Sequence, residues 1–140
     1  AESCTGGYIA HLLTREAGAS DRYNGSIVSY SNAVKKQVLK VSPETIDTAG
    51  AVSEETVVQM AKGAIEVLNT DYAIATSGIM GPDGGTPKKP VGTVWIAVGS
   101  KNAMTANKFQ FRFDRMRNIE LTANTALNML RKFILSDQDL

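Results

Sequence analysis

Apolar residues recur along the chain with two periods, and these periods predict its helices and strands. Between Ser53 and Leu68 they follow helical spacing, whereas residues 108–113 alternate between apolar and polar as in a half-exposed strand. The expected helices are residues 5–14, a short helix from Ser31 or Asn32, a helix starting within residues 41–45, and residues 53–68 and 117–135. The expected strands are residues 26–30, 71–77, 91–98 and 108–113.

This order of elements predicts an α/β domain, a three-layer sandwich in which helices flank a mixed, partly parallel sheet. Residues 108–113 are expected to run antiparallel beside residues 91–98. The expected ends of strands at Ser3, Tyr30 and Ser77 all carry hydroxyl groups. Because functional sites gather at the carboxyl ends of strands in such sheets, these residues indicate a common site.

Residues 78–93, GIMGPDGGTPKKPVGT, interrupt both periods. Five glycines and three prolines make this stretch unsuited to regular structure, so we expect a functional or connecting loop. Its Gly-Gly-Thr-Pro-Lys-Lys run suggests phosphate binding, but no Gly-Lys-Ser/Thr follows at the spacing of a nucleotide-binding P-loop. The pattern therefore argues against a nucleoside triphosphatase.

The composition of the chain mainly excludes classes of partner and of functional site. A chain of 140 residues with 43% hydrophobic residues is typical of one globular domain. Its net charge of +1 gives no electrostatic argument for nucleic acid or for a membrane surface, and we predict neither partner. A single cysteine excludes an internal disulfide and a multi-cysteine zinc site, and it fits a cytoplasmic protein. No signal peptide or membrane span is visible.

The single histidine restricts the possible catalytic chemistry. A Ser-His or Cys-His hydrolase would need His11, which lies roughly 9 Å along the predicted helix from its start. We expect His11 to be a partly exposed helix residue that cannot reach back to Ser3. A serine nucleophile here would need another base, and lysine is the established substitute.

The N-terminal Ser3-Cys4-Thr5-Gly6-Gly7 stretch is the first candidate for such chemistry. Small residues and free backbone N–H groups at the start of a helix can stabilise an oxyanion, although a plain helix cap explains the same residues. The pattern alone leaves open which of Ser3, Cys4 and Thr5 attacks.

Tyr30 and Lys35 form a second candidate pair, at a strand end and in the following helix. Their spacing differs from the Tyr-x3-Lys of short-chain dehydrogenases, and the residues alone are better explained by an interfacial tyrosine with a solvated lysine. To act as a base at neutral pH, Lys35 would need a pKa about 3 units below its usual 10.4. Arg112, Arg115 and Arg117 surround Asp114 and suit either a solvated corner or a phosphate site.

Five co-linear blocks together resemble one known family. They are AESCTGG, VSYSNAVK, GAVSEE, TSGIMGPDGGTPKKPVGTVWIA and FRFDR, and they cover nearly the whole chain. This set resembles the C-terminal domain of the CinA competence/damage-inducible family, whose members include the PncC-type nicotinamide-nucleotide amidases. Phe113 stands where the family commonly has glycine, and we expect its side chain to narrow the phosphate end of the pocket.

The resemblance implies an amidohydrolase that converts nicotinamide mononucleotide into nicotinate mononucleotide and ammonia. Its implied catalytic residues are Ser3 as the nucleophile, with Tyr30 and Lys35 in a Ser-Tyr-Lys acyl-enzyme mechanism. The implied oxyanion and substrate-binding residues are Cys4, Thr5, Gly6, Gly7, Ser77, Gly78, Arg112 and Arg115. No metal or cofactor is implied, and Cys4 is expected to be a packed, unreactive thiol.

The resemblance also bears on the organisation of the protein. Residues 1–140 would form one domain that lacks the helix and first strand found before AES in family members. A homo-oligomer is implied, and fusion to an N-terminal nucleotide-processing domain is compatible with the family. Two alternatives remain at this point: a non-catalytic ligand-binding or assembly domain of a larger CinA-type protein, and an amidase for another small carboxamide.

Overall fold

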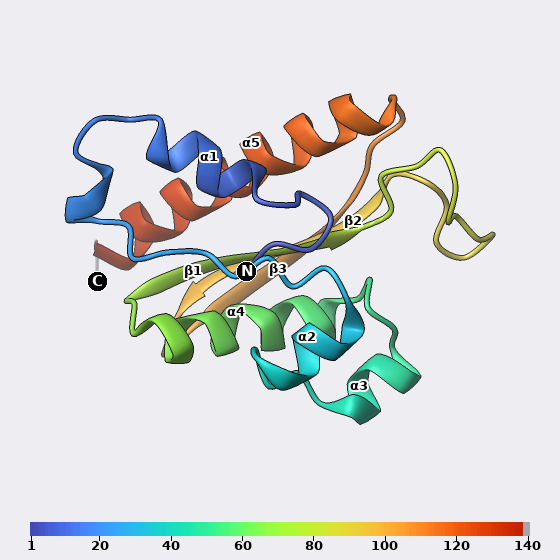
Figure 1. Ribbon diagram of the computed structural model, residues 1–140, viewed down its shortest axis with the longest axis horizontal. Coiled ribbons are helices and arrows are strands. Elements are labelled where there is room, and N and C mark those ends of the chain that lie inside the picture. The colour runs from blue at the N-terminus through green and yellow to red at the C-terminus, as the bar shows by residue number, and fades with distance from the viewer. Residues whose placement is uncertain (139–140) are drawn as a thin grey trace.

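The computed structural model describes residues 1–138, which form one sheet between two layers of helices (Figure 1). The helices are α1 (Tyr8–Thr14), α2 (Asn32–Gln37), α3 (Pro43–Thr48), α4 (Glu54–Leu68) and α5 (Arg115–Gln138), with a 3-10 helix, η1 (Ala19–Asp21), after α1. The strands are β1 (Tyr72–Gly78), β2 (Thr93–Ser100) and β3 (Met104–Gln110). The predicted α/β class and its three layers are therefore present.

The three strands form an antiparallel sheet in the order β1-β2-β3. Ala97 at the centre of β2 pairs with Ala75 on one side and with Ala106 on the other. The antiparallel placement of the last strand is confirmed, but the prediction of a mixed, partly parallel sheet is wrong for these strands. Residues 79–92 return the chain directly along β1, and a parallel partner would have needed a crossover connection instead.

The predicted strand at residues 26–30 is also corrected. Among the described residues it forms only an isolated parallel bridge, between Val28 and Glu2, and Glu2 forms a second parallel bridge to Thr76 of β1. Residues 1–3 therefore lie between two extended segments, and this short parallel patch borders the antiparallel sheet.

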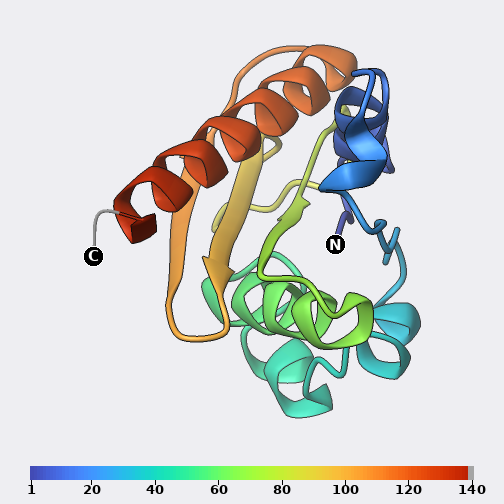
Figure 2. The same cartoon turned by 90° about the vertical axis from the view of Figure 1, so that its left-hand side faces the viewer.

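Helices cover both faces of the sheet because its side chains alternate between two apolar surfaces. Val94, Ile96 and Val98 of β2 belong to the core under α1 and α5, whereas Ala97 belongs to the core against α4. Figure 2 shows α5 along one face and α4, with α2 and α3 beyond it, along the other. No helix in residues 1–138 has the length and apolar character needed to cross a membrane.

Local signals explain how α2, α3 and α4 are placed beside the sheet. Ser53 caps α4 by accepting a hydrogen bond from the backbone N–H of Thr56, and Pro43 begins α3. The chain after α2 crosses α4 at Gly63, where an added Cβ would lie 2.1 Å from the carbonyl oxygen of Leu39. This close crossing holds the end of α2 beside α4.

Candidate active site

Three extended segments bring the predicted hydroxyl residues to one place. Glu2 pairs in parallel with both Val28 and Thr76, so Ser3 lies beside the ends of both neighbouring segments. The backbone N–H of Ser3 donates to the carbonyl oxygen of Thr76 at 3.0 Å, which puts Ser3 next to Ser77 at the end of β1. The expectation that strand ends converge is therefore met, although in the segment at residues 26–30 only Val28 forms a bridge.

Helix α2 delivers a lysine to the same place. Ser31 caps this helix by accepting a hydrogen bond from the N–H of Val34, as one of the two predicted caps. Lys35 follows one turn later with its side chain directed under the strand ends, whereas Lys36 on the adjacent position is half-buried and forms no such contact among the described residues.

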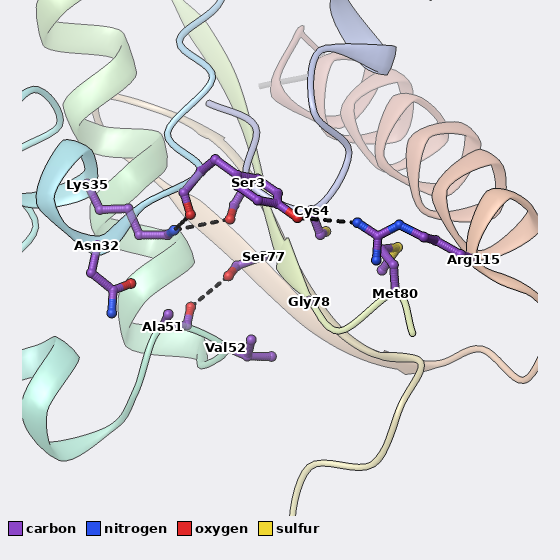
Figure 3. A pocket seen from close by; sticks show the side chains of 11 residues that line it. Ser3, Cys4, Asn32, Lys35, Ala51, Val52, Ser77, Gly78, Met80 and Arg115 are labelled. Atoms are coloured by element: carbon purple, nitrogen blue, oxygen red, sulfur yellow. Dashed lines mark hydrogen bonds between the residues drawn. The ribbon is translucent and has the colours of Figure 1, made fainter. Parts of the chain in front are cut away.

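The Lys35 side-chain nitrogen contacts three oxygen atoms, and Figure 3 shows its contact with Ser3. Its Nζ lies 3.1 Å from Ser3 Oγ, 2.9 Å from the carbonyl oxygen of Ser29 and 3.2 Å from that of Tyr30. A neutral amine has two N–H groups and one lone pair. The two carbonyl oxygens can therefore take both N–H groups and leave the lone pair directed at the Ser3 hydroxyl.

Burial favours this neutral form of Lys35. Only 1% of the residue is exposed, and none of its three partners is a carboxylate. Desolvation by burial lowers the pKa of Lys35 below its ordinary value, against a smaller opposing effect of the Cys4 thiol. A buried lysine with a lowered pKa that touches a serine hydroxyl has the properties of a general base.

The structure separates the three hydroxyl and thiol candidates at the N-terminus. Burial raises the pKa of the Cys4 thiol to about 12, so its thiolate is scarce at neutral pH. The Thr5 hydroxyl is buried against the hydroxyl of Thr76 at 2.9 Å. Ser3 alone contacts a basic nitrogen, while His11 is exposed on α1 and does not line the cleft.

These side chains lie in a cleft of about 210 Å³. It is lined by Ser3, Cys4, Tyr30, Asn32, Lys35, Ala51, Val52, Ser77, Gly78, Met80 and Arg115. The lining contains the charged side chain of Arg115 and no carboxylate, so its potential favours a negatively charged ligand.

Arg115 lies at the mouth of this cleft, at the start of α5 (Figure 3). Its guanidinium donates to the carbonyl oxygen of Gly81 at 2.7 Å and to the hydroxyl of Tyr30 at 3.2 Å. Arg112 is exposed and does not line the cleft, and Arg117 instead pairs with Glu120 on the surface of α5. The structure thus selects one of the three predicted arginines.

Several residues that were predicted to belong to the site lie outside the cleft. Thr5, Gly6 and Gly7 do not line the cleft, because the turn after Cys4 leads away from it toward α1. Arg112 is also outside the lining, because it is exposed in the connection between β3 and α5. Phe113 is 59% exposed and outside the lining, so the expected narrowing of the pocket does not occur.

The sequence analysis missed four lining residues, namely Asn32, Ala51, Val52 and Met80. Asn32 lies within the VSYSNAVK block, and Ala51 and Val52 lie within GAVSEE. Membership of these family blocks was therefore the signal that could have indicated these residues as part of the site. Ser77 explains part of their placement, because its hydroxyl donates to the carbonyl oxygen of Ala51 at 2.8 Å.

Two backbone N–H groups are left free beside Ser3. Ile79 donates its N–H to β2, so the alternation of an antiparallel pair directs the N–H of Gly78 to the opposite edge, toward Ser3. The parallel pairing between residues 1–3 and β1 ends at Thr76. The next acceptor along residues 1–3 would be the carbonyl oxygen of Ser3, but this oxygen accepts a hydrogen bond from the N–H of Gly6 instead. In the described part of the chain, neither Gly78 at this edge nor Cys4 has a backbone acceptor for its N–H.

Comparison with known proteins shows the family of this chain. The family model of the CinA C-terminal domain matches residues 1–134. A CinA-like protein of Cytophaga hutchinsonii is 48% identical over 94% of this chain, and one of Shewanella piezotolerans is 49% identical over 98%. The chain spans about a third of the length of these curated relatives, 32% in both cases.

Solved structures show the same likeness. The competence/damage inducible protein CihA from Agrobacterium tumefaciens superposes with a TM-score of 0.92 at 41% identity, covering 94% of this chain and 81% of that one. The competence damage-inducible protein A (ComA) from Klebsiella pneumoniae superposes with a TM-score of 0.92 at 34% identity, covering 96% and 83%. The chain therefore belongs to the CinA C-terminal domain family.

Proposed function

We propose that this domain is an amidase that hydrolyses the carboxamide of nicotinamide mononucleotide to nicotinate mononucleotide and ammonia. The observation that carries the proposal is the contact of 3.1 Å between the buried Lys35 Nζ and Ser3 Oγ at the base of a cleft. The family resemblance supplies the substrate, and the charge of the cleft supports it.

The first step is attack of Ser3 Oγ on the carboxamide carbon. Neutral Lys35 takes the hydroxyl proton as the new C–O bond forms, so the attacking oxygen does not carry a full negative charge. The direct contact between the two residues supports a transfer without an intermediary. The hydroxyl of Tyr30 bonds to Arg115, so we assign Tyr30 to holding Lys35 through its carbonyl oxygen and to lining the mouth.

The tetrahedral intermediate carries a negative oxygen that needs hydrogen-bond donors. The free N–H groups of Cys4 and Gly78 flank Ser3 and can donate to this oxygen. Fixed backbone donors of this kind are effective because they need no reorganisation as charge develops, and losing one typically costs about a hundredfold or more in kcat.

Lys35 then completes the cycle. The protonated lysine gives its proton to the amide nitrogen, the C–N bond breaks, and ammonia leaves an acyl ester on Ser3. A water molecule attacks that ester while Lys35 takes its proton, and return of the proton to Ser3 Oγ releases nicotinate mononucleotide.

The cleft also supports an anionic substrate. Its volume of about 210 Å³ suits the carboxamide-bearing ring, which leaves the ribose phosphate at the mouth beside Arg115. Arg115 forms no ion pair with any carboxylate of residues 1–138, so its charge is available to a phosphate. A cytoplasmic location, a homo-oligomer and a larger parent protein stay predictions from the family.

Ammonia release from nicotinamide mononucleotide, measured on the natural full-length protein, tests the proposal. We expect turnover that Ser3→Ala abolishes while thermal unfolding changes little, because Ser3 is small and gives up one hydrogen bond. Absence of ammonia release by folded protein would contradict the proposal, and binding without turnover would favour the non-catalytic alternative. Release from another carboxamide alone would retain the chemistry and change the substrate.

A further inference from the structure

Glu2 is a buried carboxylate next to Ser3 that the proposed reaction does not use. Only 2% of the residue is exposed. Its Oε1 accepts from the backbone N–H of Ile9 at 2.9 Å and its Oε2 from that of Ala10 at 3.0 Å, both in the first turn of α1. Each carboxylate oxygen therefore satisfies an N–H that has no partner within the helix.

The backbone of Glu2 is held at the same time. Its N–H donates to the carbonyl oxygen of Ile27 at 2.9 Å, and its carbonyl oxygen accepts from the N–H of Ser29 at 2.9 Å. It also forms the parallel bridges to Val28 and Thr76. One residue thus joins the extended segments that flank Ser3 to the beginning of α1.

The turn between these two attachments carries the reacting groups. It starts with Ser3 and Cys4 and is closed by a bond from the N–H of Gly6 to the carbonyl oxygen of Ser3 at 3.1 Å. Gly6 and Gly7 have φ angles of 57° and 100°, values that favour glycine and allow the sharp reversal into α1. Besides the contact of the Thr5 hydroxyl with that of Thr76, the turn is held at its two ends, and Glu2 joins those ends.

We propose that Glu2 is a positioning residue, whose carboxylate fixes the turn so that the N–H of Cys4 faces the oxygen of the carbonyl group attacked by Ser3. This inference rests on the proposed amidase function and extends it. Glu2 does not touch the substrate, because successive side chains of an extended segment alternate and its carboxylate lies on the α1 side, opposite the Ser3–Lys35 contact. Both of its oxygen atoms are already occupied by backbone donors.

Glu2→Gln tests this role with almost no change in shape. The amide keeps one acceptor oxygen and replaces the other with an NH2 group, which opposes the N–H of Ile9 or Ala10. Because displacement of a reacting group by about 1 Å can cost about a hundredfold, we expect kcat to fall by roughly tenfold to a hundredfold. KM should stay within about threefold, since the cleft wall that binds the substrate is unchanged.

A serine-directed fluorophosphonate provides a second readout that is independent of the natural substrate. Ser3 Oγ attacks phosphorus, fluoride leaves, and the phosphoryl oxygen occupies the position of the oxyanion. The endpoint of labelling counts competent molecules, so kcat is expressed per labelled Ser3 and misfolded protein does not contribute. The rate of labelling should fall in Glu2→Gln, whereas the exposed Glu16→Gln should match the wild type in both assays.

The possible outcomes separate the two proposals. The role of Glu2 would be overturned if Glu2→Gln kept both its kcat per labelled serine and its labelling rate within about threefold of the wild type. A change confined to KM would overturn it as well. If the wild type is labelled but releases no ammonia, the substrate assignment fails and Glu2 is judged by the labelling rate. Should Glu2→Gln not fold, Glu2→Asp retains the charge with a shorter side chain, and wild-type rates there would equally overturn the proposal.

Discussion

Replacing Lys35 with methionine is the most informative single perturbation of this site. Methionine is unbranched and of similar length, so it fills the buried space while removing the amine. The change deletes the contact to Ser3 and leaves the carbonyl oxygens of Ser29 and Tyr30 without their donor. Leaving the buried Ser29 carbonyl unsatisfied costs about 1–3 kcal/mol, and the partly buried Tyr30 carbonyl costs less because water can reach it. This cost is offset in part because the buried amine was itself costly to desolvate.

The expected effect on catalysis is larger than this effect on stability. General-base assistance contributes about 10²–10⁴ in rate, which corresponds to about 2.7–5.4 kcal/mol in the barrier. We therefore expect kcat for ammonia release to fall by at least about a hundredfold in Lys35→Met while a cooperative unfolding transition is retained.

Lys36→Met is the matched control, because Lys36 is adjacent and none of the Lys35 contacts involves it. Initial rates at saturating nicotinamide mononucleotide, with folding checked by circular dichroism, give the comparison. Equal losses in the two variants, or a Lys35→Met enzyme within about tenfold of wild type, would refute the assignment of the base.

Two further predictions concern pH and charge. Because the pKa of Lys35 is lowered in the folded protein, the unfolded chain binds more protons between that pKa and the ordinary value of 10.5, so the free energy of unfolding should rise with pH across this interval. Denaturant titrations at several pH values check this slope, and Lys35→Met should remove it. In the kinetic assay, kcat/KM should rise with pH through the same lowered pKa of Lys35. A kcat/KM that does not change with pH would contradict a neutral lysine as the base. Arg115→Gln should raise KM for nicotinamide mononucleotide by roughly tenfold to a hundredfold, as for loss of one charged hydrogen bond. The KM for nicotinamide riboside, which lacks the phosphate, should not change in this variant. An equal rise in KM for both substrates would show that Arg115 does not bind the phosphate.

Much of the secondary structure could be predicted because its causes are local. Ser31 and Ser53 cap α2 and α4 through their own hydroxyls, and the apolar spacing up to Leu68 gives the observed end of α4. The error at residues 26–30 has the opposite cause. An extended segment becomes a strand only when it has partners over several residues, and among the described residues Val28 alone forms a bridge.

Strand direction could not be predicted in the same way. The apolar run that became β1 suits a parallel or an antiparallel strand equally, because both kinds of pairing can bury both faces. Its direction depends on where the chain returns after residues 79–92, and no local pattern encodes that path.

For the candidate site, too, some features could be predicted from the sequence and others depended on the tertiary structure. By itself, the sequence determined the residue types that this chemistry requires. It also restricted a histidine base to His11, and it supplied the family motifs that contain Ser3 and Lys35. Only the tertiary structure decided that these two residues meet, that Cys4 is a buried thiol, and that Arg115 rather than Arg112 reaches the cleft. The physical reason is that Ser3 and Lys35 lie 32 positions apart, and both their contact and the lowered pKa of Lys35 arise from packing between segments that are distant in the chain.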